Sequence, residues 1–100
     1  MISRIPDNAV QPSCMLSIAC ALMKLKTEQE ICDFFVDLLT PSEIETLSKR
    51  WRLLQMLSQG KSQRDIAKEL GISLCKITRG AKILKKDDGI VLKLMKRKEF

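Results

Sequence analysis

Residues 62–80 read SQRDIAKELGISLCKITRG, and no other stretch says more about how this chain folds. Two short runs with apolar residues at helical spacing, 63–70 and 74–86, flank a Gly-Ile-Ser break. Gly71 permits a sharp reversal of the chain, and Ser73 can cap the helix that follows. Helices this short are unstable in isolation, so both must be held by packing against the rest of the chain.

The residues at this corner are those that a helix-turn-helix requires. Ala67 is small enough to let the two helices cross closely. Ile72 fills the space at the corner, and Ile77 packs back across it. In this motif the second helix enters the major groove of DNA while the first braces it. The sequence therefore predicts a helix-turn-helix at about 62–86, with a plain helical corner in a bundle as the structural alternative.

The N-terminal ends of the two helices carry the residues that could face DNA, because the reading helix enters the groove by that end. Candidates for contact with bases or nearby phosphates are Ser73, Leu74, Cys75, Lys76 and Thr78. Gln63, Arg64 and Lys85 are candidates for phosphates. For each single lysine, the alternative to a DNA contact is that it is only a solvated charge.

The uneven distribution of charge supports a polyanionic partner. Residues 1–48 carry three Lys/Arg and seven Asp/Glu, a net charge of −4, whereas residues 49–100 carry fifteen against five, a net charge of +10. Such asymmetry favours a nucleic-acid partner for the second half. A basic surface that only aids solubility is the alternative.

The chemistry-bearing residues argue against a metal centre and against catalysis. The four cysteines form no Cys-x-x-Cys pair and the chain has no histidine, so zinc is not expected and the thiols suggest a reduced, cytoplasmic protein. No nucleophile stands beside a plausible base, so no enzyme is predicted. We recognise no signal peptide, and the apolar run 14–23 is too short to span a bilayer.

The rest of the chain predicts an all-α domain of six short helices, because 45% of the residues are hydrophobic and only 4% aromatic. Residues 1–12 form a flexible arm and 13–100 the helical domain. The helices are expected at 13–25, 28–39, 41–59, 63–70, 74–86 and 90–97. Thr27 and Glu30 have the spacing of a capping box, as have Thr40 and Glu43, and Gly60 ends the third helix.

Apolar stripes indicate which helix faces turn inward. Those of the first two helices contain Leu16, Ala19, Cys20, Met23, Ile31, Phe34, Phe35 and Leu38. That of the third contains Ile44, Leu47, Trp51, Leu54 and Leu57, and that of the fifth Leu74, Ile77, Ala81 and Leu84. The first two helices are apolar enough to form core or a dimer seam, and a dimer suits so small a chain.

Residues 38–86 resemble the bacterial tryptophan repressor family. The resemblance rests on LLTP with Glu43 at 38–43, Arg50, SQR at 62–64, ELG at 69–71 and above all ITRG at 77–80. It implies an intertwined, all-helical homodimer that binds free L-tryptophan as corepressor and then operator DNA. The ligand would wedge between the third and fifth helices and set the reading helices for two successive major grooves.

The resemblance also implies a ligand site. Arg50 and Arg79 would lie on the two faces of the indole ring, which suits planar guanidinium groups, and Arg79 would also pair with the ligand carboxylate. The ammonium would meet backbone carbonyls near Leu39 of the other subunit, with Thr40 beside them.

Three further residues complete the implied pocket. Leu54 and Gly80 would line it, the glycine leaving room for the ligand. The third, Ile83, stands where the family has a hydroxyl residue near the ligand. In the reading helix, and apart from these three, Lys76 stands where the family has a threonine.

Other readings of the same residues stay open. LTPSEIETL followed by DIAKELGIS also resembles the carboxy-terminal domain of sigma factors and transposase DNA-binding modules, which need no ligand. Arg50 together with TRG at 78–80 argues against them, since a ligand-free module has no reason to keep these residues. A structural adaptor that uses its basic C-terminal helix on acidic partners is the remaining alternative.

Overall fold

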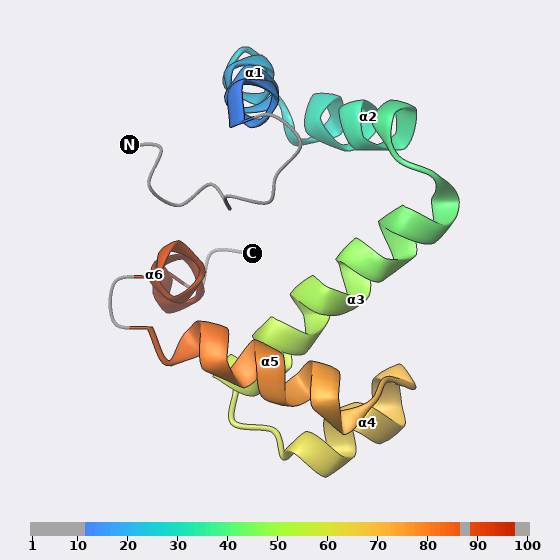
Figure 1. Cartoon of the computed structure of the whole chain (residues 1–100), viewed down its shortest axis with the longest axis vertical. Coiled ribbons are helices and arrows are strands. Elements are labelled where there is room, and N and C mark those ends of the chain that lie inside the picture. The colour runs from blue at the N-terminus through green and yellow to red at the C-terminus, as the bar shows by residue number, and fades with distance from the viewer. Residues whose placement is uncertain (1–11, 87–88, 98–100) are drawn as a thin grey trace. The chain divides into compact units, whose positions relative to one another are not determined.

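The structure is a computed structural model that describes residues 12–86 and 89–97. These contain six helices: α1 (Pro12–Met23), α2 (Glu28–Leu38), α3 (Pro41–Ser58), α4 (Gln63–Leu70), α5 (Leu74–Leu84) and α6 (Ile90–Arg97) (Figure 1). No strand occurs within the described residues, and the predicted all-α class is confirmed. The chain divides into two compact units, residues 1–40 and 41–100. The predicted N-terminal arm lies outside the described residues except for Pro12, which begins α1.

The first unit contains α1 and α2. The predicted capping box at the start of α2 is present: the Thr27 hydroxyl accepts from the Glu30 amide at 3.1 Å, and the Glu30 carboxylate accepts from the Thr27 amide at 3.2 Å. α1 ends at Met23, before the predicted Leu25, because the next two amides bond to carbonyls three residues back at 3.1 Å each. Bonds between residues three apart form a tighter turn than the α-helix, so the helix ends there.

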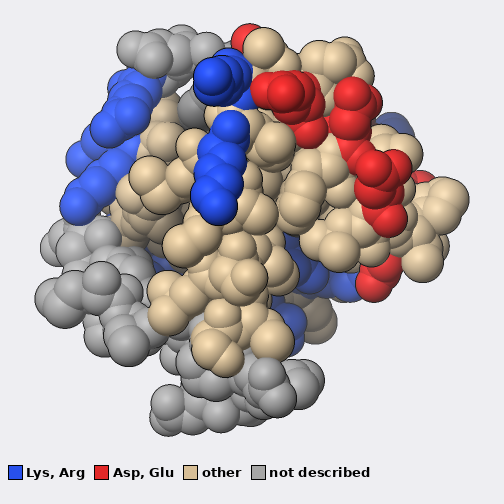
Figure 2. All heavy atoms as spheres, turned by 90° about the horizontal axis from the view of Figure 1, so that it is seen from above, with Lys and Arg blue, Asp and Glu red and all other residues tan. Residues whose placement is uncertain are grey.

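The apolar side chains of this unit are largely uncovered. α2 contains no buried residue. Met23 is 87% exposed and Leu38 54%, so neither belongs to a core within one chain, and the other expectation for these helices, a dimer seam, stays a prediction. Further exposed apolar side chains are Met15, Leu16, Ile18, Ile31 and Val36. Acidic side chains also lie on this unit, since α2 carries four carboxylates and no cation, and Figure 2 shows such side chains grouped on the surface.

The second unit is built around the helix-turn-helix. Its core cluster consists of Leu53, Met56, Ile66 and Ile77, with Leu57, Ala67, Leu70 and Ile72 packed against it. These side chains come from α3, α4, α5 and the turn between the last two, and the three helices pack against one another. Ile77, which was predicted to pack across the corner, is fully buried, and so is Ile66 of α4.

The inward face of α3 differs in part from the predicted stripe. Leu53 and Met56 are buried although neither was predicted, whereas Leu47 is 45% exposed. The physical reason is that α4 and α5 cover the C-terminal part of α3, and the apolar pattern continues along the helix beyond that contact. α3 itself ends as predicted by a left-handed glycine: Gly60 has φ 87°, and the amides of residues 60 and 61 bond back to α3 carbonyls at 3.1 Å each.

α6 occupies the predicted range and packs on α5. Its Met95 is buried, with the sulfur 3.9 Å from the Ser58 hydroxyl of α3. None of the described helices combines the length and apolar character needed to cross a bilayer. Among the described residues no cluster of three His, Cys, Asp or Glu side chains could hold a metal ion.

Candidate ligand pocket and nucleic-acid interface

Local hydrogen bonds set the corner between α4 and α5. Ser62 and Ser73 cap the two helices, each hydroxyl accepting from the backbone amide three residues on, at 3.1 and 3.4 Å. Gly71 ends α4 in the left-handed conformation, with φ 65° and ψ 37°, and its amide bonds to the Ala67 carbonyl at 2.9 Å. These features confirm the predicted bounds of α4 and both caps. The N-terminal end of α5 is held by the turn and by the core beneath it.

The predicted DNA-facing residues are all exposed. They are Gln63 and Arg64 at the start of α4, Ser73, Leu74, Cys75, Lys76 and Thr78 at the start of α5, and Lys85 at its end. Leu74 is 56% exposed, whereas Ile77 on the same apolar stripe is fully buried. The Thr78 hydroxyl donates to the Leu74 carbonyl at 2.9 Å, and its oxygen remains able to accept.

α5 is shorter at its C-terminus than predicted. It ends at Leu84 rather than Lys86, because the Lys85 amide bonds to the Lys82 carbonyl, three residues back, at 3.2 Å. Lys85 therefore lies at the C-cap, where a cation meets the negative end of the helix dipole.

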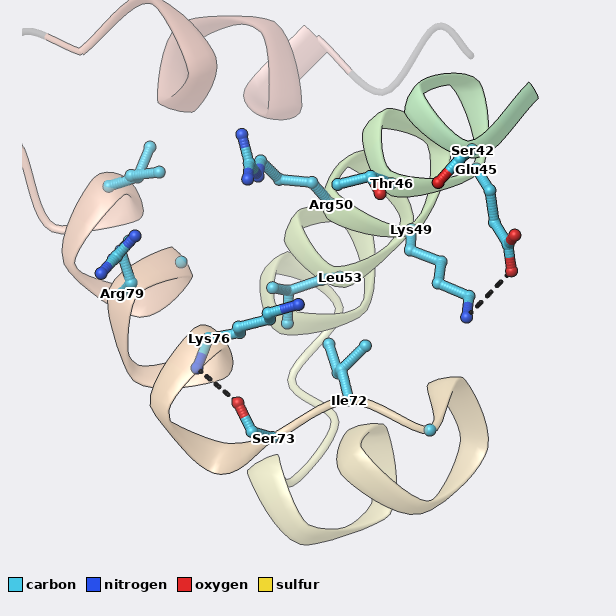
Figure 3. Close-up of a pocket in the computed structure, with 13 residues that line it drawn as sticks. Ser42, Glu45, Thr46, Lys49, Arg50, Leu53, Ile72, Ser73, Lys76 and Arg79 are labelled. Atoms are coloured by element: carbon cyan, nitrogen blue, oxygen red, sulfur yellow. Dashed lines mark hydrogen bonds and ion pairs between the residues drawn. The ribbon is translucent and has the colours of Figure 1, made fainter. Parts of the chain in front are cut away.

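A pocket of about 430 Å³ lies between α3, α5 and the turn that precedes α5 (Figure 3). α3 contributes Ser42, Glu45, Thr46, Lys49, Arg50 and Leu53, and the turn and α5 contribute Gly71, Ile72, Ser73, Lys76, Arg79, Gly80 and Ile83. Every lining residue belongs to the second compact unit. The volume falls within the usual range of small-molecule sites.

The two arginines that the resemblance singled out line this pocket together. Arg50 reaches from α3 toward α5, and Arg79 stands on α5 (Figure 3). Both are exposed, and neither has an acidic partner among the described residues. Two planar cations on different walls of one cavity can stack on a flat ring or pair with a carboxylate.

Gly80 of α5 lies close against α3. The residue is buried, and a Cβ built on it would lie 3.1 Å from Leu53 Cδ2 and 3.5 Å from Leu54 Cδ2. A larger residue would meet the side chains of α3 there. Ile83 also lines the pocket, whereas Leu54 is buried behind Gly80 and is not among the lining residues.

The remaining two predicted ligand residues, Leu39 and Thr40, end the first unit and do not line the pocket. Leu39 is the C-cap of α2, and its amide bonds to the Phe35 carbonyl at 2.9 Å.

Four polar residues of α3 line the pocket without having been predicted: Ser42, Glu45, Thr46 and Lys49. With Arg50 and Leu53 they follow helical spacing, which is the one sequence signal that could have found them. Lys49 is paired with Glu45, one turn away, at 3.2 Å. The ionisable lining groups are thus four cations and one carboxylate, so the pocket has a positive potential that favours anions.

A comparison with known families identifies the family of the chain. The sequence model of the family described as Trp repressor protein matches residues 15–99. The chain belongs to the Trp repressor family. The match includes α2 to α6, and therefore the helix-turn-helix and every pocket residue. The family recognised from residues 38–86 is confirmed.

Similar proteins carry the same family name. A Trp operon repressor homolog of Chlamydia caviae is 39% identical over 66 residues, which cover 65% of each chain. One of Xylella fastidiosa is 49% identical over 45 residues, or 44% of this chain and 49% of the relative. One of Chlamydia trachomatis is 35% identical over 63 residues, or 62% and 67%. The chain thus spans less than two thirds of the first two relatives. No solved structure matches significantly.

Proposed function

We propose that this chain is a ligand-dependent transcriptional repressor that binds L-tryptophan as corepressor and then operator DNA of tryptophan-related genes. The observation that carries the proposal is one pocket with Arg50 and Arg79 on different walls, directly behind the helix-turn-helix of a Trp repressor family member. Such a repressor acts in the cytoplasm and is no enzyme; both statements rest on family membership.

In this proposal the indole ring lies between the guanidinium groups of Arg50 and Arg79, and Arg79 also pairs with the carboxylate. Gly80 and Ile83 form the apolar part of the site. Family members have a hydroxyl residue where Ile83 stands, so this pocket is more apolar at that position than theirs. The ligand needs no metal and no other cofactor.

A homodimer completes the proposal. α1 and α2 leave apolar side chains uncovered within one chain, and a second copy can cover them. The C-terminal end of α2 in the partner would bring the backbone near Leu39, together with Thr40, to the ligand ammonium. A helix C-terminus suits a cation, because its dipole is negative there.

The ligand acts by the preference that it shows for the DNA-binding state. A molecule held by both α3 and α5 fixes their spacing, and the start of α5 carries Ser73, Leu74, Cys75, Lys76 and Thr78 toward bases or phosphates. Gln63, Arg64 and Lys85 would hold phosphates. A ligand shifts such an equilibrium only by its differential affinity for the two states.

The deciding experiment titrates the purified chain with L-tryptophan in a calorimeter and follows gel retardation of candidate promoter DNA with and without the amino acid. We expect tryptophan to bind and to tighten DNA binding. DNA binding of equal strength without tryptophan would instead identify a ligand-independent helix-turn-helix protein of the sigma-factor or transposase type.

A further inference from the structure

Two lysines of the pocket lie outside the part that the ligand would use. Lys49 comes from α3 and Lys76 from α5, and both line the cavity together with Ile72 and Ser73 of the turn. Along α5, Lys76 lies one turn closer to the DNA-facing start than Arg79. We call this part of the cavity, lined by Lys49, Ile72, Ser73 and Lys76, the turn end.

The side chains of the two lysines differ in their present partners. Lys76 is exposed, reaches from α5 toward α3 (Figure 3) and has no acidic partner among the described residues. Lys49 bonds to Glu45 at 3.2 Å, but this is an exposed pair, with side chains 43% and 67% accessible. Exposed pairs of this spacing are weak, so Lys49 can leave Glu45 and pair with an anion that binds it more strongly.

We propose that Lys49 and Lys76 bind the phosphate backbone of operator DNA at the turn end of the pocket, Lys49 being a DNA contact contributed by α3, outside the helix-turn-helix. The inference rests on the proposed function. A small ligand with a single carboxylate already has Arg79 as its partner, which leaves the turn end for a second anion. DNA supplies that anion, because the turn end adjoins the start of the reading helix.

This assignment gives the pocket a direct role in coupling ligand to DNA. The two lysines stand on different helices, so the spacing of α3 and α5 decides how well both reach the same stretch of backbone. A ligand wedged between these helices sets that spacing. The α3 contact is therefore made fully only in the liganded state, and by linkage DNA that uses it tightens ligand binding by the same factor.

The test measures operator affinity of wild type and Lys49→Gln by fluorescence anisotropy, with and without saturating tryptophan. With tryptophan we expect a loss of about five- to tenfold per half-site at about 0.1 M salt, and a salt slope reduced by about 1 per half-site. The enhancement by tryptophan, which is the ratio of the two affinities, should shrink as well. A mere loss of charge at the surface would leave that ratio unchanged.

The chain offers a matched control. Lys61 pairs with Glu69 at 3.3 Å, with side chains 44% and 54% exposed, and neither residue lines the pocket. Lys61→Gln should keep the wild-type ratio. Glu45→Gln, which frees Lys49 and removes a negative charge, should tighten operator binding, whereas Glu69→Gln should not.

Two results would overturn the inference. In one, Lys49→Gln behaves like Lys61→Gln in affinity, salt slope and tryptophan enhancement. In the other, Lys49→Gln or Lys76→Gln weakens tryptophan binding in the absence of DNA, which would assign the turn end to the ligand carboxylate. If wild type binds DNA equally well without tryptophan, the proposed function itself is wrong. This result needs only the wild-type chain, whereas failure of the lysine assignment is seen only in the variants.

Discussion

Gly80 of α5 lies so close to Leu53 of α3 that a Cβ at position 80 would come within 3.1 Å of Leu53 Cδ2. Leu53 cannot move aside easily, since it is 3% exposed and belongs to the core cluster with Met56, Ile66 and Ile77. The same contact forms part of the pocket wall, because both residues line the cavity. The present spacing of α3 and α5 therefore depends on the absence of a Cβ at position 80.

Gly80→Ala should destabilise the chain by about 1 kcal/mol, because overpacking costs about 1–3 kcal/mol and exceeds the gain in helix propensity of up to about 1 kcal/mol. Urea unfolding measures the change. In a Leu53→Ala background the obstacle is gone, and the same substitution should stabilise the chain. Destabilisation of equal size in both backgrounds would mean that Leu53 is not the obstacle.

Arg79→Ala should weaken tryptophan binding by at least about 30-fold, since a charged hydrogen bond is worth about 1.5–3 kcal/mol and a cation on a ring face about 0.5–2 kcal/mol. Calorimetry with the free amino acid measures this without DNA. Lys82→Ala is the control, because Lys82 is exposed on the same helix and does not line the pocket. Unchanged affinity in Arg79→Ala would refute the role given to the arginine.

Helix starts were predictable from the sequence because they depend on local chemistry. The hydroxyls of Thr27, Ser62 and Ser73 each accept from an amide three residues on, and such bonds follow from residue type and spacing alone. Gly71 fixed the end of α4 in the same way. The ends of α1 and α5 were less predictable, since no glycine stands at either and backbone hydrogen bonds of the turn decide where the helix stops.

Side-chain burial and the extent of the pocket depended on how helices cross, which the sequence does not contain. Leu47 and Leu74 continue an apolar pattern past the region where α3 and α5 are covered, so both are exposed. Lys49 and Glu45 look like a solvated pair on a helix surface, and only the crossing of α5 makes them line a cavity. Arg50 and Arg79 came from family resemblance and not from any property of the residues themselves.

Operator affinity should fall steeply with salt, by about 10³- to 10⁵-fold between about 50 and about 200 mM if six to ten phosphates are neutralised. The expectation rests on Arg64 at the start of α4 and on the excess of cations along α5 and its C-cap, since Arg64, Lys76 and Lys85 are exposed. Fluorescence anisotropy with labelled promoter DNA gives the slope. A flat response would exclude DNA as the partner, and tryptophan binding without DNA, measured over the same range, is the reference for effects on the protein alone.

Leu16→Asp should convert a dimer into monomers. Leu16 is 44% exposed on α1, among the large apolar side chains left exposed in one chain, and a carboxylate placed in an apolar interface loses its hydration. Sedimentation equilibrium should give wild type about twice the 11.4 kDa of one chain, and the dissociation constant of the variant should rise by at least about tenfold.

Lys24→Asp is the control for that experiment, because it also adds negative charge to the first unit but at an exposed polar site after α1. It should leave the dimer intact. Because the ligand ammonium is proposed to meet the partner's α2, Leu16→Asp should also weaken tryptophan binding in proportion to the dimer lost. A wild-type chain that sediments as a monomer and still binds tryptophan would show that one chain holds the whole ligand site.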